Sequence, residues 1–133
     1  VGRTFIKPTQ KERESAVHLK LSVLSSVVKS KRLVLIDDSI VRGTTMASLI
    51  RMLKDAGATE VHVRISSPPF LFPCYYGTDV PSNDQLIASS HTAAEICASI
   101  GADSLGYMKL EDLKQMTGDL PLCKACFDSH YPV

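Results

Sequence analysis

The chain has 133 residues, which suits one domain with room for a hydrophobic core. Its 15 basic and 14 acidic residues leave a net charge of +1, and it has no Trp and few aromatic residues, so nothing in the composition supports nucleic-acid binding. No apolar run approaches the ~20 residues that span a bilayer, and no secretory signal is visible. We therefore expect a cytoplasmic protein with no membrane or nucleic-acid partner.

The secondary structure of the residues before the first predicted strand is less clearly indicated by the sequence. Residues 1–8 can be an extended segment or a loop. A helix is expected over residues 10–17, because Thr9 and Glu12 have the spacing of a capping box. A break and a short helix then lead to a polar turn at residues 30–32.

The central part of the chain predicts strand, loop, helix and strand. Leu33–Ile36 is a continuous apolar run, which favours a strand buried on both faces of a parallel sheet. A helix capped by Thr44 or Thr45 is expected next, with an apolar stripe of Met46, Leu49, Ile50 and Leu53, and it ends at Gly57. Val61–Ile65 alternates apolar and polar side chains, which predicts a second strand with one polar face and a right-handed βαβ unit.

The remainder of the chain predicts shorter elements and a tail. In order, these are an irregular stretch over 70–81, a helix over 84–88 after Ser82, a helix from Thr92 to Gly101, a strand over 104–108, a helix stopped by Gly118, and a tail without periodicity over 119–133. Together these elements predict an α/β fold in which helices flank a parallel sheet, with an irregular Cys-containing tail.

The most informative stretch is Leu33–Thr45, which places two adjacent carboxylates between an apolar strand and a loop that opens a helix. At a strand end that enters a loop, Asp37 and Asp38 can both reach one ligand. Carboxylates accept hydrogen bonds from sugar hydroxyls, or they hold Mg²⁺ together with phosphate oxygens and water. The helix N-terminus favours phosphate. This pattern predicts a site for a phosphorylated sugar with a metal, and a surface Asp pair that caps a turn is the alternative.

The loop that follows the two carboxylates is expected to wrap a phosphate. Gly43 lets the backbone approach closely, and Arg42 either reaches phosphate or lies exposed. Ile40 and Val41 are expected to pack beneath the loop. The hydroxyl donors are Ser39, Thr44 and Thr45. The glycine spacing is neither that of a Walker A loop nor G-x-G-x-x-G.

Leu33–Thr45 resembles the phosphoribosyl pyrophosphate (PRPP) binding motif of type I phosphoribosyltransferases. The flanking stretches, Val1–Gln10 and Cys74–Ser82, resemble the amidophosphoribosyltransferase family, also called glutamine PRPP amidotransferase. The resemblance covers essentially the whole chain. It implies a single partial phosphoribosyltransferase domain over residues 1–133. The parts of that domain would be a flexible-loop region over 1–8, a PRPP-binding core over 33–117 and a Cys-containing tail over 118–133.

The resemblance also implies a reaction, in which a glycosyltransferase moves glutamine-derived ammonia onto PRPP, as the first step of purine biosynthesis. Asp37 and Asp38 would be the catalytic, ribose-binding and Mg²⁺-binding residues, and Arg3 and Lys7 would belong to the flexible loop. The ribose and 5-phosphate would also contact Ser39, Arg42, Gly43, Thr44 and Thr45.

The chain begins at Val1 without Met, so we expect a fragment. The N-terminal glutaminase domain and the pyrophosphate loop of the family would lie upstream. The fragment alone is then expected to have little or no transferase activity, and the full-length protein to form a homo-oligomer.

Disulfides are rare in cytoplasmic proteins, so the four cysteines are better explained as metal ligands, redox groups or buried residues. By spacing alone, zinc or a redox dithiol suits the CxxC pair, Cys123 and Cys126. The resemblance to the iron–sulfur branch of the family implies that Cys74, Cys123 and Cys126 are three ligands of a 4Fe–4S cluster. The fourth ligand would lie upstream of Val1, and Cys97 is expected in the core.

Two other functions remain open on the sequence. A non-catalytic PRPP-binding regulator has the same fold, but it needs a DNA-binding segment, and no basic patch or helix-turn-helix is evident here. A zinc-stapled interaction module would leave the loop after Asp37 unexplained.

Overall fold

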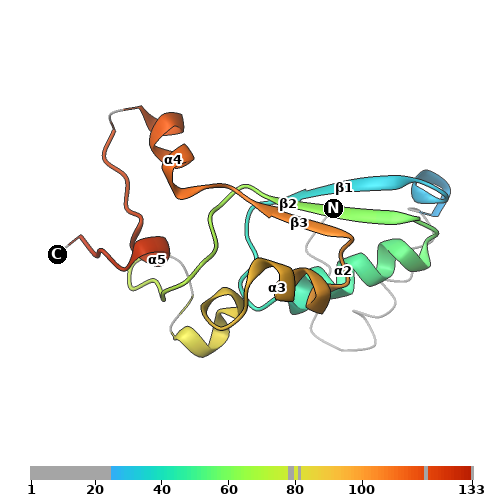
Figure 1. Ribbon diagram of the computed structural model, residues 1–133, viewed down its shortest axis with the longest axis horizontal. Helices are drawn as coiled ribbons and strands as arrows, with labels where there is room; N and C mark the ends of the chain where they lie inside the picture. Colours follow the sequence, from blue (N-terminus) through green and yellow to red (C-terminus); the bar gives the residue numbers. More distant parts are fainter. Residues whose placement is uncertain (1–24, 78–79, 81, 119, 133) are drawn as a thin grey trace.

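In the computed structural model, three strands of the described part of the chain form a parallel sheet in the order β1–β2–β3 (Figure 1). The strands are β1 (Arg32–Asp37), β2 (Glu60–Ile65) and β3 (Ser104–Tyr107). The structure describes residues 25–77, 80, 82–118 and 120–132. The predicted flexible loop with Arg3 and Lys7, and the predicted helix over 10–17, lie outside these residues.

The helices are α2 (Thr44–Asp55), α3 (Ala93–Ile100), α4 (Leu110–Thr117) and α5 (Ala125–Asp128), with 3₁₀ turns η2 (Asn83–Gln85) and η3 (Ile87–Ser89). Figure 1 shows α2 and α3 on one face of the sheet, whereas α4 and α5 lie beyond the carboxyl ends of the strands. No helix in the described part of the chain is long and apolar enough to cross a membrane. The predicted α/β fold with a parallel sheet is confirmed.

The core lies between the sheet and the pair α2 and α3. Val61 and Val63 of β2 have no exposed surface, and Ile50 of α2 is 1% exposed. Ile96 and Ile100 of α3 belong to the same buried cluster. This packing follows from the alternation of β2 and from the apolar stripe of α2, both of which the sequence predicted.

A capping box starts α3 at Thr92, where the sequence predicted the helix to begin. The backbone N–H of Glu95 donates to Thr92 Oγ1 at 3.2 Å, and the N–H of Thr92 donates back to Glu95 Oε1 at 3.0 Å. That backbone hydrogen bond from Thr92 holds the pKa of the Glu95 carboxyl below its usual value. The helix ends at Gly101, which adopts the left-handed conformation at φ 78°.

Three predictions about local structure are wrong. The N-cap of α2 is Gly43, so Thr44 is the first helical residue and neither threonine caps the helix. The predicted helix over 84–88 is replaced by η2 and η3, and Ser82 makes no side-chain capping bond. The tail also contains a short helix, α5, which the sequence did not indicate because four residues carry too little periodicity.

The prediction that the first strand is buried on both faces is also wrong. Val34 and Ile36 of β1 are 65% and 73% exposed. The cause is that β1 is an edge strand and the described helices cover only the opposite face of the sheet. On the same open face, His62 is satisfied by Glu60 and Ser104, at 2.9 and 2.7 Å, as expected for a structural histidine.

This packing predicts that matched Ile→Ala substitutions on α2 and β1 differ in cost. Ile50→Ala opens a cavity in the core and should lower the free energy of unfolding by about 2–5 kcal/mol. Ile36→Ala removes an exposed side chain and should cost less than about 1 kcal/mol. Urea unfolding followed by circular dichroism measures both. Equal costs at the two positions would contradict the one-sided core.

Candidate functional site

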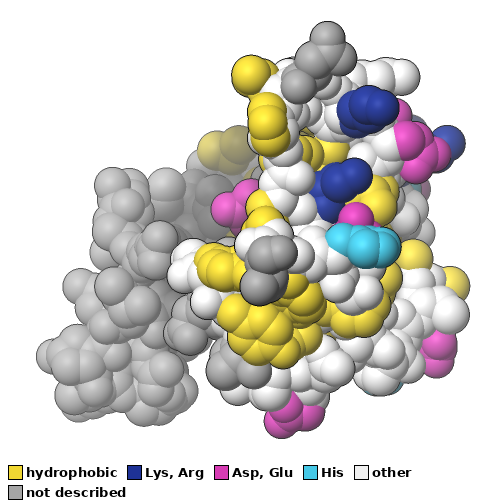
Figure 2. Space-filling view, turned by 90° about the vertical axis from the view of Figure 1, so that its left-hand side faces the viewer, with side chains coloured by type: hydrophobic (Ala, Val, Ile, Leu, Met, Phe, Trp, Pro, Cys, Tyr) yellow, Lys and Arg dark blue, Asp and Glu magenta, His cyan; other side chains and the backbone are white. Residues whose placement is uncertain are grey.

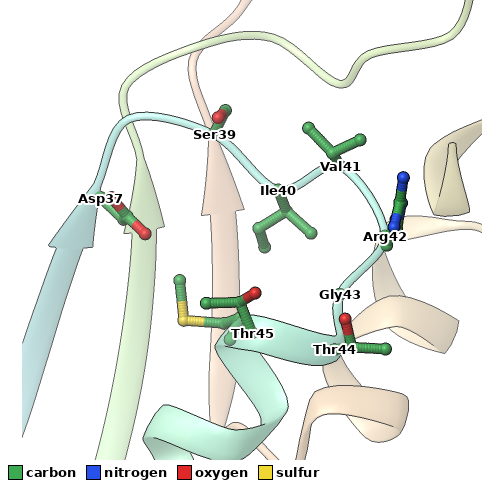
Figure 3. A pocket seen from close by; sticks show the side chains of 9 residues that line it. Asp37, Ser39, Ile40, Val41, Arg42, Gly43, Thr44 and Thr45 are labelled. Carbon is green, nitrogen blue, oxygen red and sulfur yellow. The ribbon is translucent and has the colours of Figure 1, made fainter. Parts of the chain in front are cut away.

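The candidate site lies at the carboxyl end of β1, where the chain turns through a loop into α2. The loop surrounds a cavity of about 370 Å³ (Figure 3). Its lining consists of Asp37 and the continuous run from Ser39 to Met46. In open α/β sheets ligands bind outside the carboxyl ends of the strands, so the cavity has the expected place for a ligand.

The N-terminus of α2 has the features of a phosphate site. Gly43 at φ 87° lets the chain enter the helix, and no side chain caps the first N–H groups. No acidic residue lies in the first turn. Free N–H groups and the partial positive charge of a 12-residue helix therefore face the cavity that Thr44 and Thr45 line.

Below the loop, Ile40 provides the support that the sequence predicted. Its side chain is 2% exposed and points to the inside of the turn (Figure 3). Val41 is half-buried, and its carbonyl accepts a hydrogen bond from the N–H of Ile87 at 2.9 Å. The loop is thus held by apolar packing and by one backbone bond from a distant segment.

The two adjacent carboxylates have different positions. Asp37 lines the cavity, and Asp38 is absent from the lining. The N–H of Asp38 donates to Asp37 Oδ1 at 2.8 Å, and Ser39 Oγ donates to Asp38 Oδ1 at 3.1 Å. Both residues are exposed, and each carboxylate keeps a second oxygen that accepts no hydrogen bond from the described residues.

The oxygen donors of Asp37 and Asp38 suit Mg²⁺, which prefers one or two carboxylates with phosphate oxygens and water. Among the described residues, no group of three His, Cys, Asp or Glu side chains is arranged to hold a metal ion. Oxygens of a phosphorylated ligand would therefore have to complete such a site.

Sequence reasoning missed two residues that contact the loop. Arg42 Nη2 donates to Gln85 Oε1 at 2.7 Å, although 43 positions separate them. Ile87 binds the carbonyl of Val41 and lies against Gly43. Neither residue belongs to a recognisable motif, so no local signal could have found them.

The structure brings the three predicted cluster cysteines to one region. The N–H groups of Leu71 and Phe72 donate to the carbonyl of Cys126 at 2.9 and 3.1 Å, which ties the segment before Cys74 to α5. Burial raises the pKa of the Cys126 thiol, and the nearby thiols of Cys74 and Cys123 act in the same direction.

Aromatic residues accompany these thiols. The rings of Phe70 and Phe127 are 5.2 Å apart, and those of Tyr75 and Tyr131 are 4.9 Å apart. Figure 2 shows hydrophobic side chains gathered on the face of the molecule at which the C-terminal segment lies. Cys97 lies elsewhere, in α3, where its thiol donates to the carbonyl of Ala102 at 3.3 Å.

The soft thiolate donors of the three cysteines suit an iron–sulfur cluster or zinc. Their number leaves one of four ligand positions open, and the described residues contain no group of three His, Cys, Asp or Glu side chains placed to hold a metal ion. The donor chemistry therefore fits a cluster, and the ligand set is incomplete.

Known proteins of similar sequence are named amidophosphoribosyltransferases. The chain is 52% identical, over its whole length, to the amidophosphoribosyltransferase of Synechocystis sp., and 54% identical over 99% of its length to that of Methanocaldococcus jannaschii. The chain is homologous to part of the amidophosphoribosyltransferases. It spans only about a quarter of these relatives, 27% and 28% of their lengths, and corresponds to their C-terminal part. No protein-family model matches the chain.

A solved amidophosphoribosyltransferase structure has the same fold. The glutamine PRPP amidotransferase of B. subtilis, complexed with ADP and GMP, matches 98% of the chain with a TM-score of 0.77 and 47% sequence identity. The chain covers 30% of that structure. This confirms the predicted partial phosphoribosyltransferase fold.

The left-handed backbone of Gly43 gives a direct test of the loop. Gly43→Ala should lower the free energy of unfolding by about 1–2 kcal/mol, because an alanine is strained at positive φ. The added Cβ would also lie 3.2 Å from Ile87 Cδ1. Gly77→Ala is the matched control, since nothing lies within 4 Å of its Cβ. Urea unfolding that shows the same cost for both would contradict the loop geometry.

Proposed function

We propose that this chain is the PRPP-binding part of an amidophosphoribosyltransferase, a glycosyltransferase that forms 5-phosphoribosylamine from PRPP and glutamine-derived ammonia. The observation that carries the proposal is the cavity in which Asp37 lies opposite the uncapped N-terminus of α2. The identity of about half the residues with enzymes of that name supports it. No observation favours the non-catalytic regulator.

Each part of the loop has a role in this proposal. The 5-phosphate binds the N–H groups at the start of α2 and the hydroxyls of Ser39, Thr44 and Thr45. Asp37 accepts hydrogen bonds from the ribose hydroxyls, with Asp38 as its neighbour. Arg42 adds a positive charge at the edge of the same cavity.

The reaction needs positioning more than acid–base chemistry. The ammonia lone pair forms a bond to C1 as the bond from C1 to the pyrophosphate oxygen breaks, and the pyrophosphate leaves with the electron pair. The new C1 ammonium then loses a proton to give the amine. Ammonia is already nucleophilic, so the residues of this chain act by holding the ribose 5-phosphate in a fixed orientation. Mg²⁺ bound with PRPP would neutralise charge on the leaving pyrophosphate.

The parts of the reaction that grip pyrophosphate and deliver ammonia remain predictions. Arg3 and Lys7, the predicted flexible-loop residues, lie outside the described residues. A glutaminase domain, a homo-oligomer and a cytoplasmic location are likewise predictions. The isolated chain should show little or no PRPP-dependent ammonia incorporation, and full rates from this chain alone would contradict the proposed division.

PRPP binding can be tested by substituting one aspartate that lines the cavity and one that lies outside it. Asp37→Asn should raise the Kd for PRPP with Mg²⁺ by about tenfold or more, because a hydrogen bond to a charged acceptor is worth about 1.5–3 kcal/mol. Asp55→Asn, at the other end of α2, should change Kd by less than about twofold. Isothermal titration calorimetry measures both. Unchanged binding by the Asp37→Asn variant would contradict the proposed role.

We also propose that Cys74, Cys123 and Cys126 hold three positions of a 4Fe–4S cluster in the protein as its gene encodes it. Support comes from the spatial grouping of the thiols, which joins α5 to the segment at Cys74. A cluster there would fasten the C-terminal tail to the domain. The isolated chain is expected to hold the cluster incompletely or not at all.

The cluster proposal has a matched pair of cysteine variants. In the gene's full product, purified anaerobically, Cys123→Ser should lose more than half of the bound iron and sulfide and of the visible absorbance. Cys97→Ser should keep both, because Cys97 lies in α3. Metal and sulfide analysis provides the measurement. Bound zinc without iron in the parent protein would contradict the proposal.

A further inference from the structure

A second segment, far from the loop in sequence, fixes the shape of the loop by three contacts. Gln85 Oε1 accepts a hydrogen bond from Arg42 Nη2 at 2.7 Å. The N–H of Ile87 donates to the carbonyl of Val41 at 2.9 Å. The side chain of Ile87 packs against Gly43, where a Cβ would come within 3.2 Å of Cδ1. Three successive loop residues are therefore each held by residues 85–87.

The segment that makes these contacts is itself held in place. Leu86 is 1% exposed, so it anchors the segment between Gln85 and Ile87 in the interior. The hydroxyl of Ser89 is a hydrogen-bond donor shared by the carbonyls of Asn83 and Leu86, at 3.0 and 2.8 Å, which ties η2 to η3. The segment can thus act as a template on which the loop is built.

Gln85 is the residue that fixes the guanidinium of Arg42. No carboxylate lies within ion-pair distance of Arg42 in the described part of the chain. A guanidinium has five N–H donors, and the bond to Gln85 uses one of them. Arg42 lines the loop cavity, so its remaining donors and its charge lie at the edge of that cavity.

Holding a flexible cation in advance favours binding. An arginine side chain that must be ordered on ligand binding weakens affinity by about 2–13-fold, because its rotamer freedom is lost. Arg42 is exposed, but its bond to Gln85, in a segment anchored by the buried Leu86, offsets part of that loss of affinity in advance. The same template keeps the N–H groups near Gly43 facing the cavity, because Ile87 restricts the loop on the other side.

We propose that Gln85 is a positioning residue that orients Arg42 and loop 39–45 for a phosphate-bearing ligand. The identity of that ligand, PRPP, rests on the proposed function, whereas the orientation of Arg42 by Gln85 does not. Gln85 itself makes no contact with the ligand. Its effect on binding passes entirely through Arg42 and the loop.

The test uses a double-mutant cycle in this chain, with PRPP and Mg²⁺ as the probe in calorimetry. Gln85→Ala should raise Kd by about 3–10-fold, and Arg42→Ala by at least as much. The double variant should bind no more than about twofold more weakly than Arg42→Ala, because the two residues act as one unit. Gln85→Glu keeps an acceptor oxygen and should restore Kd to within about threefold of the parent. Gln115→Ala, at an exposed position of α4, is the matched control and should leave Kd unchanged.

A measurement without ligand separates this inference from the proposed function. Gln85→Ala should shift the backbone amide resonances of Arg42, Gly43 and Thr44, whereas Gln115→Ala should not. If Gln85→Ala shifts these resonances but the parent chain does not bind PRPP, the proposed function is overturned and the positioning role is kept. Unshifted loop amides, or additive effects of the Gln85 and Arg42 substitutions on Kd, would overturn the positioning role.

Discussion

The structure of the site depends on one turn, in which Gly43 at positive φ passes the chain from the loop into α2. This conformation leaves the first N–H groups of the helix without a side-chain partner, and it brings them to the cavity beside the carboxyl end of β1. A side chain at this position would be strained and would press on Ile87. The features that suit phosphate at this site therefore follow from backbone geometry more than from side-chain chemistry.

Packing of the sheet and the core holds the loop in this geometry. One face of β2 packs in the core with α2 and α3, and this packing fixes where β1 ends and where α2 begins. Ile40 inserts beneath the loop, and residues 85–87 hold it from the other side. A loop supported from two sides presents its N–H groups without a large ordering cost on binding, which is the main advantage of a preformed site.

Elements with strong periodicity could be predicted from the sequence, and those that depend on distant contacts could not. The apolar stripe of α2 and the alternation of β2 carry their own signals, and both were confirmed. The exposure of Val34 and Ile36 depends on which helices cover the sheet, and a local apolar run does not report that.

At the site, too, residues that act through distant contacts could not be predicted from the sequence. Asp37 and Gly43 were visible in a local motif, whereas Gln85 and Ile87 reach the loop only through the tertiary fold. The expected capping by Thr44 or Thr45 failed because Gly43 takes the N-cap position, so hydroxyl spacing alone was misleading. The grouping of Cys74 with Cys126 was suggested by family resemblance, and spacing could not have shown it.

We propose that loop 39–45, at the start of α2, binds the ribose 5-phosphate part of PRPP. The most direct measurement is a titration of the ¹⁵N-labelled chain with PRPP and Mg²⁺, followed by backbone amide resonances. Binding at this loop should give saturable shifts concentrated at Ser39 and at residues 42–46, with ribose 5-phosphate giving the same pattern and ribose giving none. Saturable shifts confined to other parts of the chain, or no shifts at millimolar PRPP, would contradict it.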